Sequence, residues 1–316
     1  MARLIEADVA IIGGGPAGLF AAECLARQSL AVTVFDRMPS VGRKFLLAGR
    51  GGLNLTHSEV PERFNARYGW RQDVIAPLLD AFSPADLSQW AQSLGEETFV
   101  GSSGRVFPKS FKATQLLRAW LARLKDMGVR FEIRQNWIGF DDSGHALFTG
   151  ADGSVTKAKS RAVLMAMGGA SWPRMGSDGR WVEAFAALDI PVAPLRPANC
   201  GIEIAWSQHM KDKGGGHPLK RIAISTGGRT ERGEAMITGE GLEGGAVYAV
   251  LDLVRDEIAA RGKAMLALDL RPDRHLEGLA QDIDRTPASQ STANRLRKGA
   301  KLDAGAMMLL NEVHRP

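Results

Sequence analysis

Short apolar runs alternate with stretches of helical spacing in the first part of the chain, which predicts alternating strands and helices. The runs at 5–12 and 31–35 contain many β-branched residues, as is typical of strands buried in a parallel sheet. Residues 16–28 between them have helical spacing and begin with a proline, which suits the first turn of a helix. The pattern therefore predicts a strand, a glycine-rich loop, a helix and a second strand.

The pattern downstream predicts a long loop over 37–72 and then more helices and strands. Helices are expected over 73–81, 84–94 and 113–127, and strands over 129–134, 136–140, 145–149 and 154–158. Asp-Ser-Gly and Asp-Gly turns separate the last three strands, which are therefore expected to form an antiparallel meander. The apolar run 162–167 is predicted to be a buried strand that ends at Gly168 and Gly169.

Prolines at 191, 194 and 197 indicate a domain boundary near residue 190. Beyond it we expect strands over 200–206, 220–226, 234–238 and 264–269, a helix over 245–261, and a polar helical tail. The chain is thus predicted to have two domains, an α/β domain over 1–190 and a second domain over 191–316. The second is expected to be β-rich over 191–270 and helical over 271–316.

Composition narrows the class of protein. Glycine makes up 36 of the 316 residues, above the usual share of about 7%. The net charge of +5 comes without a dense basic run, so we expect no nucleic-acid partner.

Cys24 and Cys200 form no paired motif, which favours a reducing compartment. The uncharged stretch 9–22 is too short to span a bilayer, so we expect a soluble, cytoplasmic protein with no membrane partner.

The first site-forming motif is Gly13-x-Gly15-x-x-Gly18, placed between a strand and a helix, with Asp36 at the end of the next strand. This is the dinucleotide-binding fingerprint in its full context. Gly13 makes the tight turn, Gly15 lets the backbone approach a pyrophosphate, and Gly18 lets the helix pack on the strand. The helix N-terminus, with Pro16 and Ala17, attracts phosphate, and Asp36, followed by Arg37, accepts ribose hydroxyls. A glycine-rich turn without a ligand explains this combination less well.

The later segments favour FAD over NAD. A meander followed by a strand that ends in a glycine pair is the layout of a glutathione-reductase-like FAD domain, whereas an NAD domain would continue with strand–helix repeats. Ala166-Met167-Gly168-Gly169 resembles the Ala-Thr-Gly turn of that superfamily. The histidines show no metal-ligand spacing, so no metal site is predicted.

The second motif covers residues 42–56 and reads GRKFLLAGRGGLNLT. Together with the segment 168–179 and the element 238–245, it resembles the bacterial NAD(P)/FAD-dependent oxidoreductases called aminoacetone-oxidase-like or BaiN-type flavoproteins. The sequence departs from this family where Gly52-Leu53 replaces Arg-Cys, which rules out a redox role for that cysteine. His57 also replaces an asparagine, and Gly239 replaces a histidine.

The resemblance implies roles for several residues of the second motif. Arg43 and Lys44 are expected to neutralise the pyrophosphate or approach the flavin ring. Gly51 and Gly52 are expected to let the chain pass the ring closely, beside Asn54 and Leu55. A mobile basic surface loop is the alternative for this motif. His57 is a weak candidate for an acid–base group, since a solvent-facing loop histidine is the simpler interpretation.

The resemblance implies an α/β fold, with a Rossmann-like parallel sheet and meander plus an inserted β-rich and helical domain. It implies a flavoprotein oxidoreductase that binds FAD, acts on a small organic substrate, and uses NAD(P)H or oxygen as partner. No second fingerprint is present, so a nicotinamide is expected to bind only transiently. One alternative is a flavoprotein that acts on tRNA or another RNA. Another is a truncated, inactive relative, because the family runs to roughly 400 residues and its final flavin-covering segment is not recognised here.

Overall fold

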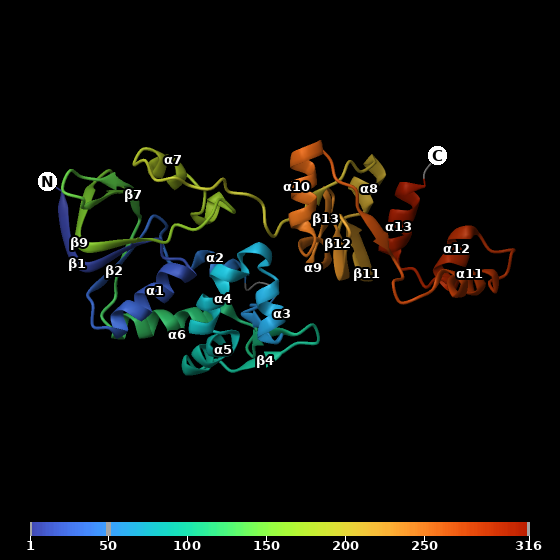
Figure 1. Ribbon diagram of the computed structural model, residues 1–316, viewed down its shortest axis with the longest axis horizontal. Helices are drawn as coiled ribbons and strands as arrows, with labels where there is room; N and C mark the ends of the chain where they lie inside the picture. The colour runs from blue at the N-terminus through green and yellow to red at the C-terminus, as the bar shows by residue number, and fades with distance from the viewer. Residues whose placement is uncertain (1, 49–51, 315–316) are drawn as a thin grey trace. The chain divides into compact units, whose positions relative to one another are not determined.

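The computed structural model describes residues 2–48 and 52–314. These residues form two compact units, Met1–Leu195 (unit 1) and Arg196–Pro316 (unit 2), each with its own hydrophobic core. The predicted boundary between residues 190 and 191 falls in the irregular segment that precedes unit 2. Figure 1 shows both units.

Unit 1 alternates strands and helices. Its strands are β1 (Arg3–Ile12), β2 (Val32–Asp36), β3 (Thr56–His57), β4 (Thr98–Val100), β5 (Arg105–Pro108), β6 (Arg130–Ile133), β7 (Gln135–Phe140), β8 (Ala146–Gly150) and β9 (Val155–Met165). Its helices are α1 (Pro16–Arg27), α2 (Arg43–Ala48), α3 (Pro61–Ala66), η2 (Gly69–Arg71), α4 (Gln72–Ala81), α5 (Pro84–Ser93), α6 (Ala113–Asp126), η3 (Pro173–Met175) and α7 (Trp181–Ala186).

The main sheet of unit 1 has the strand order β6-β2-β1-β9-β8-β7. β6, β2, β1 and β9 run parallel, and β7, β8 and β9 form an antiparallel meander. The register pairs Ile12 with both Phe35 and Met165, so β1, β2 and β9 end at the same edge of the sheet. The predicted α/β class, a Rossmann-like parallel sheet with a meander, is therefore confirmed.

The two faces of the sheet pack against different layers. Ile11 and Val34 point to the face covered by α1 and α6, where they join Leu19 and Leu116. Their neighbours Ile12 and Phe35 point to the opposite face, because successive strand residues alternate between faces. There the rings of Phe35 and Phe148 stack with centroids 4.2 Å apart, so the meander folds back over the sheet.

Two sequence predictions for unit 1 are wrong. The segment 37–72 is not one long loop, since it contains α2, β3, α3 and η2. Elements of two to six residues are too short to show a hydrophobic period. The run 162–167 is also not a separate buried strand. Its first residues are the end of β9, which is continuous from Val155, and Ala162 to Met167 are exposed or half-buried.

Unit 2 is built on an antiparallel sheet with the order β10-β13-β12-β11-β14. Its strands are β10 (Ile202–Glu203), β11 (Pro218–Thr226), β12 (Arg229–Ile237), β13 (Gly241–Glu243) and β14 (Ala267–Asp269). Its helices are α8 (Gln208–Lys213), α9 (Gly245–Tyr248), α10 (Leu251–Arg261), α11 (Leu276–Asp284), α12 (Thr292–Gly299) and α13 (Ala304–Val313). The described strands of unit 2 all lie before residue 270, interspersed with α8, α9 and α10, and α11, α12 and α13 follow.

The predicted bounds in unit 2 need correction. The strands expected over 200–206 and 264–269 shrink to β10 and β14, whereas the strand expected over 234–238 is the end of the longer β12. The helix expected over 245–261 is interrupted, because Val250 donates to Val247 in a tighter turn between α9 and α10. Such a turn leaves the apolar spacing unchanged, so the sequence does not reveal it.

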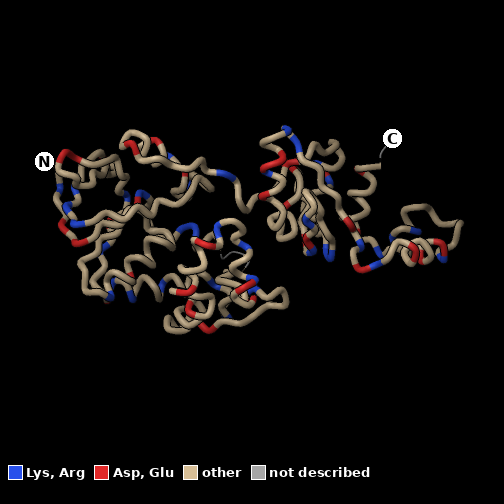
Figure 2. Tube along the Cα trace, in the orientation of Figure 1, with Lys and Arg blue, Asp and Glu red and all other residues tan. Residues whose placement is uncertain are grey.

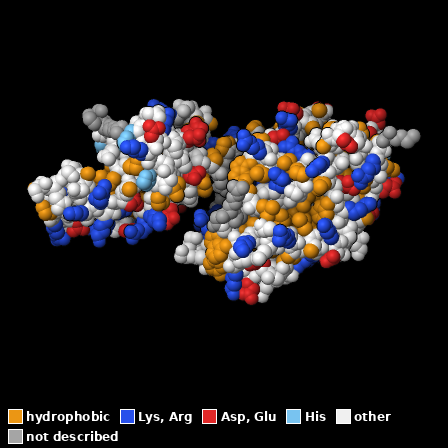
Figure 3. Space-filling view, turned by 180° about the vertical axis from the view of Figure 1, so that it is seen from behind, with side chains coloured by type: hydrophobic (Ala, Val, Ile, Leu, Met, Phe, Trp, Pro, Cys, Tyr) orange, Lys and Arg blue, Asp and Glu red, His pale blue; other side chains and the backbone are white. Residues whose placement is uncertain are grey.

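The surface carries both signs of charge and several exposed apolar side chains. Lys, Arg, Asp and Glu are spread along both units (Figure 2). Hydrophobic side chains gather on the face of the larger unit that Figure 3 shows. Across residues 2–48 and 52–314, no helix is both long and apolar enough to cross a bilayer.

Candidate functional site

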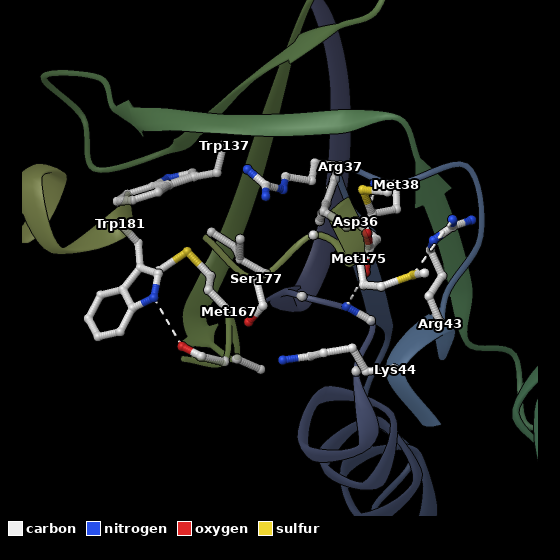
Figure 4. A pocket seen from close by; sticks show the side chains of 18 of the residues that line it. Asp36, Arg37, Met38, Arg43, Lys44, Trp137, Met167, Met175, Ser177 and Trp181 are labelled. Atoms are coloured by element: carbon white, nitrogen blue, oxygen red, sulfur yellow. Dashed lines mark hydrogen bonds between the residues drawn. The ribbon is translucent and has the colours of Figure 1, made fainter. Parts of the chain in front are cut away.

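A cavity of about 500 Å³ lies at the carboxyl ends of β1, β2 and β9, where parallel α/β sheets bind their ligands (Figure 4). The glycine loop after β1, the end of β2, the start of α2 and the segment after β9 all line it. The start of β7 lines it as well, so residues from five separate parts of unit 1 meet at one edge of the sheet.

The glycine loop is held by close backbone approaches. A Cβ on Gly13 would lie 2.3 Å from the carbonyl oxygen of Ala166, and one on Gly18 would lie 1.9 Å from that of Gly13. Both positions therefore accept only glycine, and Gly18 brings α1 against β1 as the fingerprint predicts. A Cβ on Gly15 would meet no atom within 4 Å, because this residue faces the cavity.

The N-terminus of α1 opens onto the same cavity. Gly15 is its N-cap residue, no side chain caps it, and Pro16 stands in the first turn. Gly15, Pro16 and Ala17 all line the cavity. The first backbone N–H groups of the helix and its positive dipole end are thus available to an anion.

Asp36 lies at the end of β2 and faces the glycine loop. Its Oδ2 accepts a hydrogen bond of 2.7 Å from the Gly14 N–H, and its Oδ1 accepts one of 2.8 Å from the Met38 N–H. Burial raises the pKa of Asp36 above its ordinary value, although these two hydrogen bonds oppose the shift. Each oxygen keeps capacity for a second hydrogen bond, so the carboxylate can still accept ligand hydroxyls.

Two cations at the start of α2 border the cavity. Lys44 and Trp181 enter it from opposite sides, and the Lys44 Nζ lies 3.6 Å from the point where a Cβ on Gly168 would stand (Figure 4). Arg43 lines the edge, where its guanidinium contacts the Met175 sulfur at 3.9 Å. Within the described residues, neither cation forms an ion pair with a carboxylate. Both remain available to an anionic ligand.

The segment after β9 closes another side of the cavity. The Ser177 hydroxyl donates to the Gly169 carbonyl at 2.7 Å, and the Trp181 indole N–H donates to the Gly168 carbonyl at 3.0 Å. Asp178 joins this segment to the end of β2 through a 2.8 Å ion pair with Arg37.

Most of the predicted cofactor residues meet at this cavity. Those that line it are Gly13, Gly15, Pro16, Ala17, Asp36, Arg37, Arg43, Lys44, Ala166 and Gly168. Gly18 and Gly169 do not line it, but Gly18 packs against Gly13 and the Gly169 carbonyl accepts from Ser177, two residues that do. Gly52, Asn54 and Leu55 do not line it, since they lie beside the small sheet β3-β5-β4, with Asn54 exposed and Leu55 hydrogen-bonded to Val106. Gly51 lies outside the described residues.

His57 pairs with β5 and does not line the cavity. Its Nδ1 accepts from the Glu59 N–H at 3.1 Å, which places the ring proton on Nε2, where it donates to the Ser103 carbonyl at 3.0 Å. Both ring nitrogens therefore hold the loop, and this geometry gives the acid–base role no support.

Several cavity residues were not predicted from the sequence. Gln135, Asn136 and Trp137 follow β6, and Met38 and Ser40 follow β2. Their position just beyond the carboxyl ends of parallel strands is the signal that could have identified them. Among the described residues, no cluster of His, Cys, Asp and Glu has the grouping that a metal ion needs.

Comparison with known proteins places this arrangement in a family. The profile of the HI0933-like protein Rossmann domain matches residues 7–253. A ribosomal RNA dihydrouridine synthase of Haemophilus influenzae is 25% identical and covers 91% of this chain and 69% of its own. A thiamine thiazole synthase of Pyrobaculum aerophilum is 35% identical, over 30% of this chain and 38% of its own.

A solved structure has a similar fold. The 3-ketosteroid-Δ4-(5α)-dehydrogenase of Rhodococcus jostii superposes with a TM-score of 0.50 at 17% identity, over 98% of this chain and 76% of the other. The family profile spans most of the chain, including the glycine loop, Asp36 and the segment after β9. The chain therefore belongs to the HI0933-like Rossmann domain proteins, a family of FAD-dependent oxidoreductases.

Proposed function

We propose that this chain is an oxidoreductase that holds FAD in the cavity at the carboxyl ends of β1, β2 and β9. One observation carries the proposal: the N-terminus of α1, the Asp36 carboxylate and the Lys44 ammonium all line the same cavity, and among the described residues no side chain caps this helix end and no carboxylate pairs with Lys44. The helix N-terminus suits a pyrophosphate, the Asp36 carboxylate suits ribose hydroxyls, and the Lys44 ammonium suits a further negative charge.

The residues of the chain would act on the cofactor as follows. The N–H groups at the start of α1 bind the pyrophosphate, and Gly15 leaves room for it. Asp36 accepts ribose hydroxyls, while its bonds to Gly14 and Met38 fix its orientation. Lys44, which also lines the cavity, offsets negative charge of the cofactor. The bound flavin supplies hydride and electron transfer, and the protein supplies binding, orientation and electrostatics.

The substrate proposed for this site is a small organic molecule, with NAD(P)H or oxygen as the second partner. Titrating the purified 316-residue chain with FAD and with FMN is the direct test. We expect flavin absorbance to remain with the protein after desalting for FAD, and anaerobic NADH or NADPH to bleach it. A chain that retains no flavin would contradict this proposal and support the inactive relative instead.

A second candidate is a flavoprotein that acts on RNA. The relative named ribosomal RNA dihydrouridine synthase aligns with 91% of this chain, which favours an RNA substrate. The charges of both units are mixed and the net charge is only +5, so electrostatic contact with RNA phosphates would be weak (Figure 2). Adding RNA to the reduced, FAD-loaded protein separates the candidates. Reoxidation by RNA with formation of dihydrouridine would favour this one, and no response to RNA would exclude it.

The buried position of Asp36 predicts a pH-dependent affinity for FAD. Binding requires the carboxylate, and the pKa of Asp36 in the free protein is raised by burial. The affinity should therefore be full above that pKa and fall as the pH drops through it, at a higher pH than for an ordinary aspartate. Asp36→Asn should weaken FAD binding about ten- to hundredfold and flatten this profile. Fluorescence titration of FAD between neutral and acid pH measures both.

Asp152→Asn is the matched control for Asp36→Asn, because Asp152 lies in the exposed turn between β8 and β9. It should keep the affinity and the profile of the unmodified protein. If the FAD affinity of Asp36→Asn still falls as the pH is lowered, Asp36 is not the titrating group.

A further inference from the structure

Phe111 presents a large aromatic ring to solvent outside the cavity. It lies between β5 and α6 in the chain, its side chain is 51% exposed, and it does not line the cavity. Its φ of 53° falls in the left-handed region, which a bulky residue rarely adopts because its Cβ approaches the backbone. Strain of this kind persists only where surrounding contacts impose it, and it is concentrated at binding sites.

A buried carboxylate holds the turn that carries Phe111. Glu96 is only 8% exposed, and it accepts from the Ser110 N–H at 2.9 Å and from the Ser110 hydroxyl at 2.8 Å. The Phe111 N–H donates to the Pro108 carbonyl at 3.0 Å, and the Lys112 N–H donates to the Ser110 hydroxyl oxygen at 3.2 Å. These bonds fix the backbone on both sides of Phe111, so a rigid turn presents the ring.

Contacts hold part of the Phe111 ring and leave the rest open. Its centroid lies 5.1 Å from that of Phe99 and 6.0 Å from that of Phe107, which are register partners in β4 and β5 (Figure 1). The backbone of Gly52 approaches it as well, since a Cβ there would lie 3.1 Å from the Phe111 Cδ1. A supported ring that is still half exposed offers a flat apolar surface to a planar ligand.

The charge around this ring is positive. Residues 105–112 read RVFPKSFK, with three cations and no acidic residue. Arg105 and Lys112 are exposed, and neither forms an ion pair within the part of the chain that the structure describes, whereas Lys109 pairs with the exposed Glu97. An exposed aromatic ring beside cations is the combination that binds nucleotides, because the base stacks on the ring and the cations attract the phosphate.

We propose that Phe111 is a stacking site for the base of a nucleotide, whose phosphate is bound by Lys112 and Arg105. A free nucleotide and one nucleotide of a single-stranded RNA offer the same base and phosphate, so both have the chemistry that this site binds. An apolar protein surface fits less well, because lysines are depleted at the core of protein interfaces. The site lies outside the cavity and does not depend on the proposed FAD.

Fluorescence anisotropy of a labelled, short uridine oligoribonucleotide, added at low salt to the 316-residue chain without FAD, tests this proposal. Phe111→Ala should weaken its binding about tenfold or more, and Phe111→Trp should retain it. An oligonucleotide of the same length without bases should bind more weakly and should not respond to Phe111→Ala. Lys112→Gln should weaken binding and lower its salt dependence by about one phosphate contact.

Two control variants separate stacking from folding and from nonspecific binding. Phe111→Gly should keep the fold, since glycine adopts this backbone freely, yet it should bind as weakly as Phe111→Ala. Thermal unfolding reports the fold. Trp70→Ala removes another exposed ring of unit 1, 81% exposed with the Arg71 guanidinium 4.1 Å from its centroid, and it should bind the oligonucleotide normally.

Competition by UMP and AMP identifies the source of the nucleotide. Competition at concentrations comparable with the oligonucleotide assigns the site to a free nucleotide, and tighter binding of the oligonucleotide assigns it to an RNA strand. Three results would overturn the proposal: neither probe binds, Phe111→Ala binds both normally, or Phe111→Gly lowers the unfolding temperature and leaves the affinity unchanged. The last would mean that the ring serves packing alone. Since no FAD is present, failure here is distinct from failure of the proposed cofactor site.

Discussion

Replacing Gly15 by valine is expected to abolish FAD binding and leave the fold intact. Gly15 has an extended backbone, with φ −80° and ψ −179°, that any residue can adopt, and its Cβ would meet no protein atom within 4 Å. The valine methyls would instead occupy the cavity beside the N-terminus of α1, where we place the pyrophosphate. The loss of affinity should reach about a hundredfold or more, equivalent to ~2.7 kcal/mol. Fluorescence titration gives the affinity, and thermal unfolding without FAD reports the fold.

Two other glycines make this prediction specific. Gly278→Val places the same side chain at a site in α11 that also has open space, and it should leave FAD binding unchanged. Gly18→Val should lower the unfolding temperature even without FAD, because its Cβ would lie 1.9 Å from the Gly13 carbonyl oxygen. If Gly15→Val binds FAD normally, the cofactor does not approach this loop and the proposed site is wrong.

The residues predicted best are those whose role depends on local chain geometry. Gly13, Gly15, Gly18 and Asp36 belong to one strand–loop–helix–strand unit, so their spacing alone indicates that they meet. Lys44 also reaches the cavity, because α2 starts directly after Gly42, whose N–H donates to the Gly14 carbonyl. This contact between two glycine-rich segments ties the second motif to the first.

The residues predicted less well depend on how distant segments pack. Asn54 belongs to the second motif, but its neighbour Leu55 is hydrogen-bonded to β5, outside the cavity. Trp137 lies just beyond β6 and lines the cavity, but recognising this requires knowing that β6 pairs in parallel with β2, a contact between distant segments. The apolar run 162–167 predicted a separate buried strand, but residues 162–165 are the end of β9 and residues 162–167 are exposed or half-buried. The hydrophobicity of a segment indicates how much of it favours burial, but the tertiary structure determines which neighbouring segments bury it.

A buried carboxylate outside the cavity gives the second prediction. Glu23 on α1 has a side chain only 2% exposed. Its Oε2 accepts from the indole N–H groups of Trp90 at 3.0 Å and Trp120 at 2.8 Å. Its Oε1 accepts from the guanidinium groups of Arg27 at 2.5 Å and Arg123 at 3.1 Å. This single carboxylate joins α1, α5 and α6 beneath the sheet.

Replacing Glu23 by alanine should destabilise the fold by about 3–5 kcal/mol, because it leaves two buried indole N–H groups and a partly buried Arg123 without their acceptor. Denaturant unfolding measures the loss. The matched control is Glu97→Ala, which removes an exposed ion pair with Lys109 and should change stability little.

The same carboxylate should make the stability of the fold depend on pH. Burial alone would raise the pKa of Glu23, but the hydrogen bonds from Trp90, Arg27, Arg123 and Trp120 outweigh it and hold the pKa below its ordinary value. A carboxyl whose pKa is lower in the folded chain stabilises the fold above its ordinary pKa, and this contribution is lost as the pH falls through the lowered one. Glu23→Gln keeps an acceptor for the indoles but does not titrate, so its loss of stability relative to the unmodified chain should shrink toward acid pH. A constant difference at every pH would mean that Glu23 is not ionised in the folded protein.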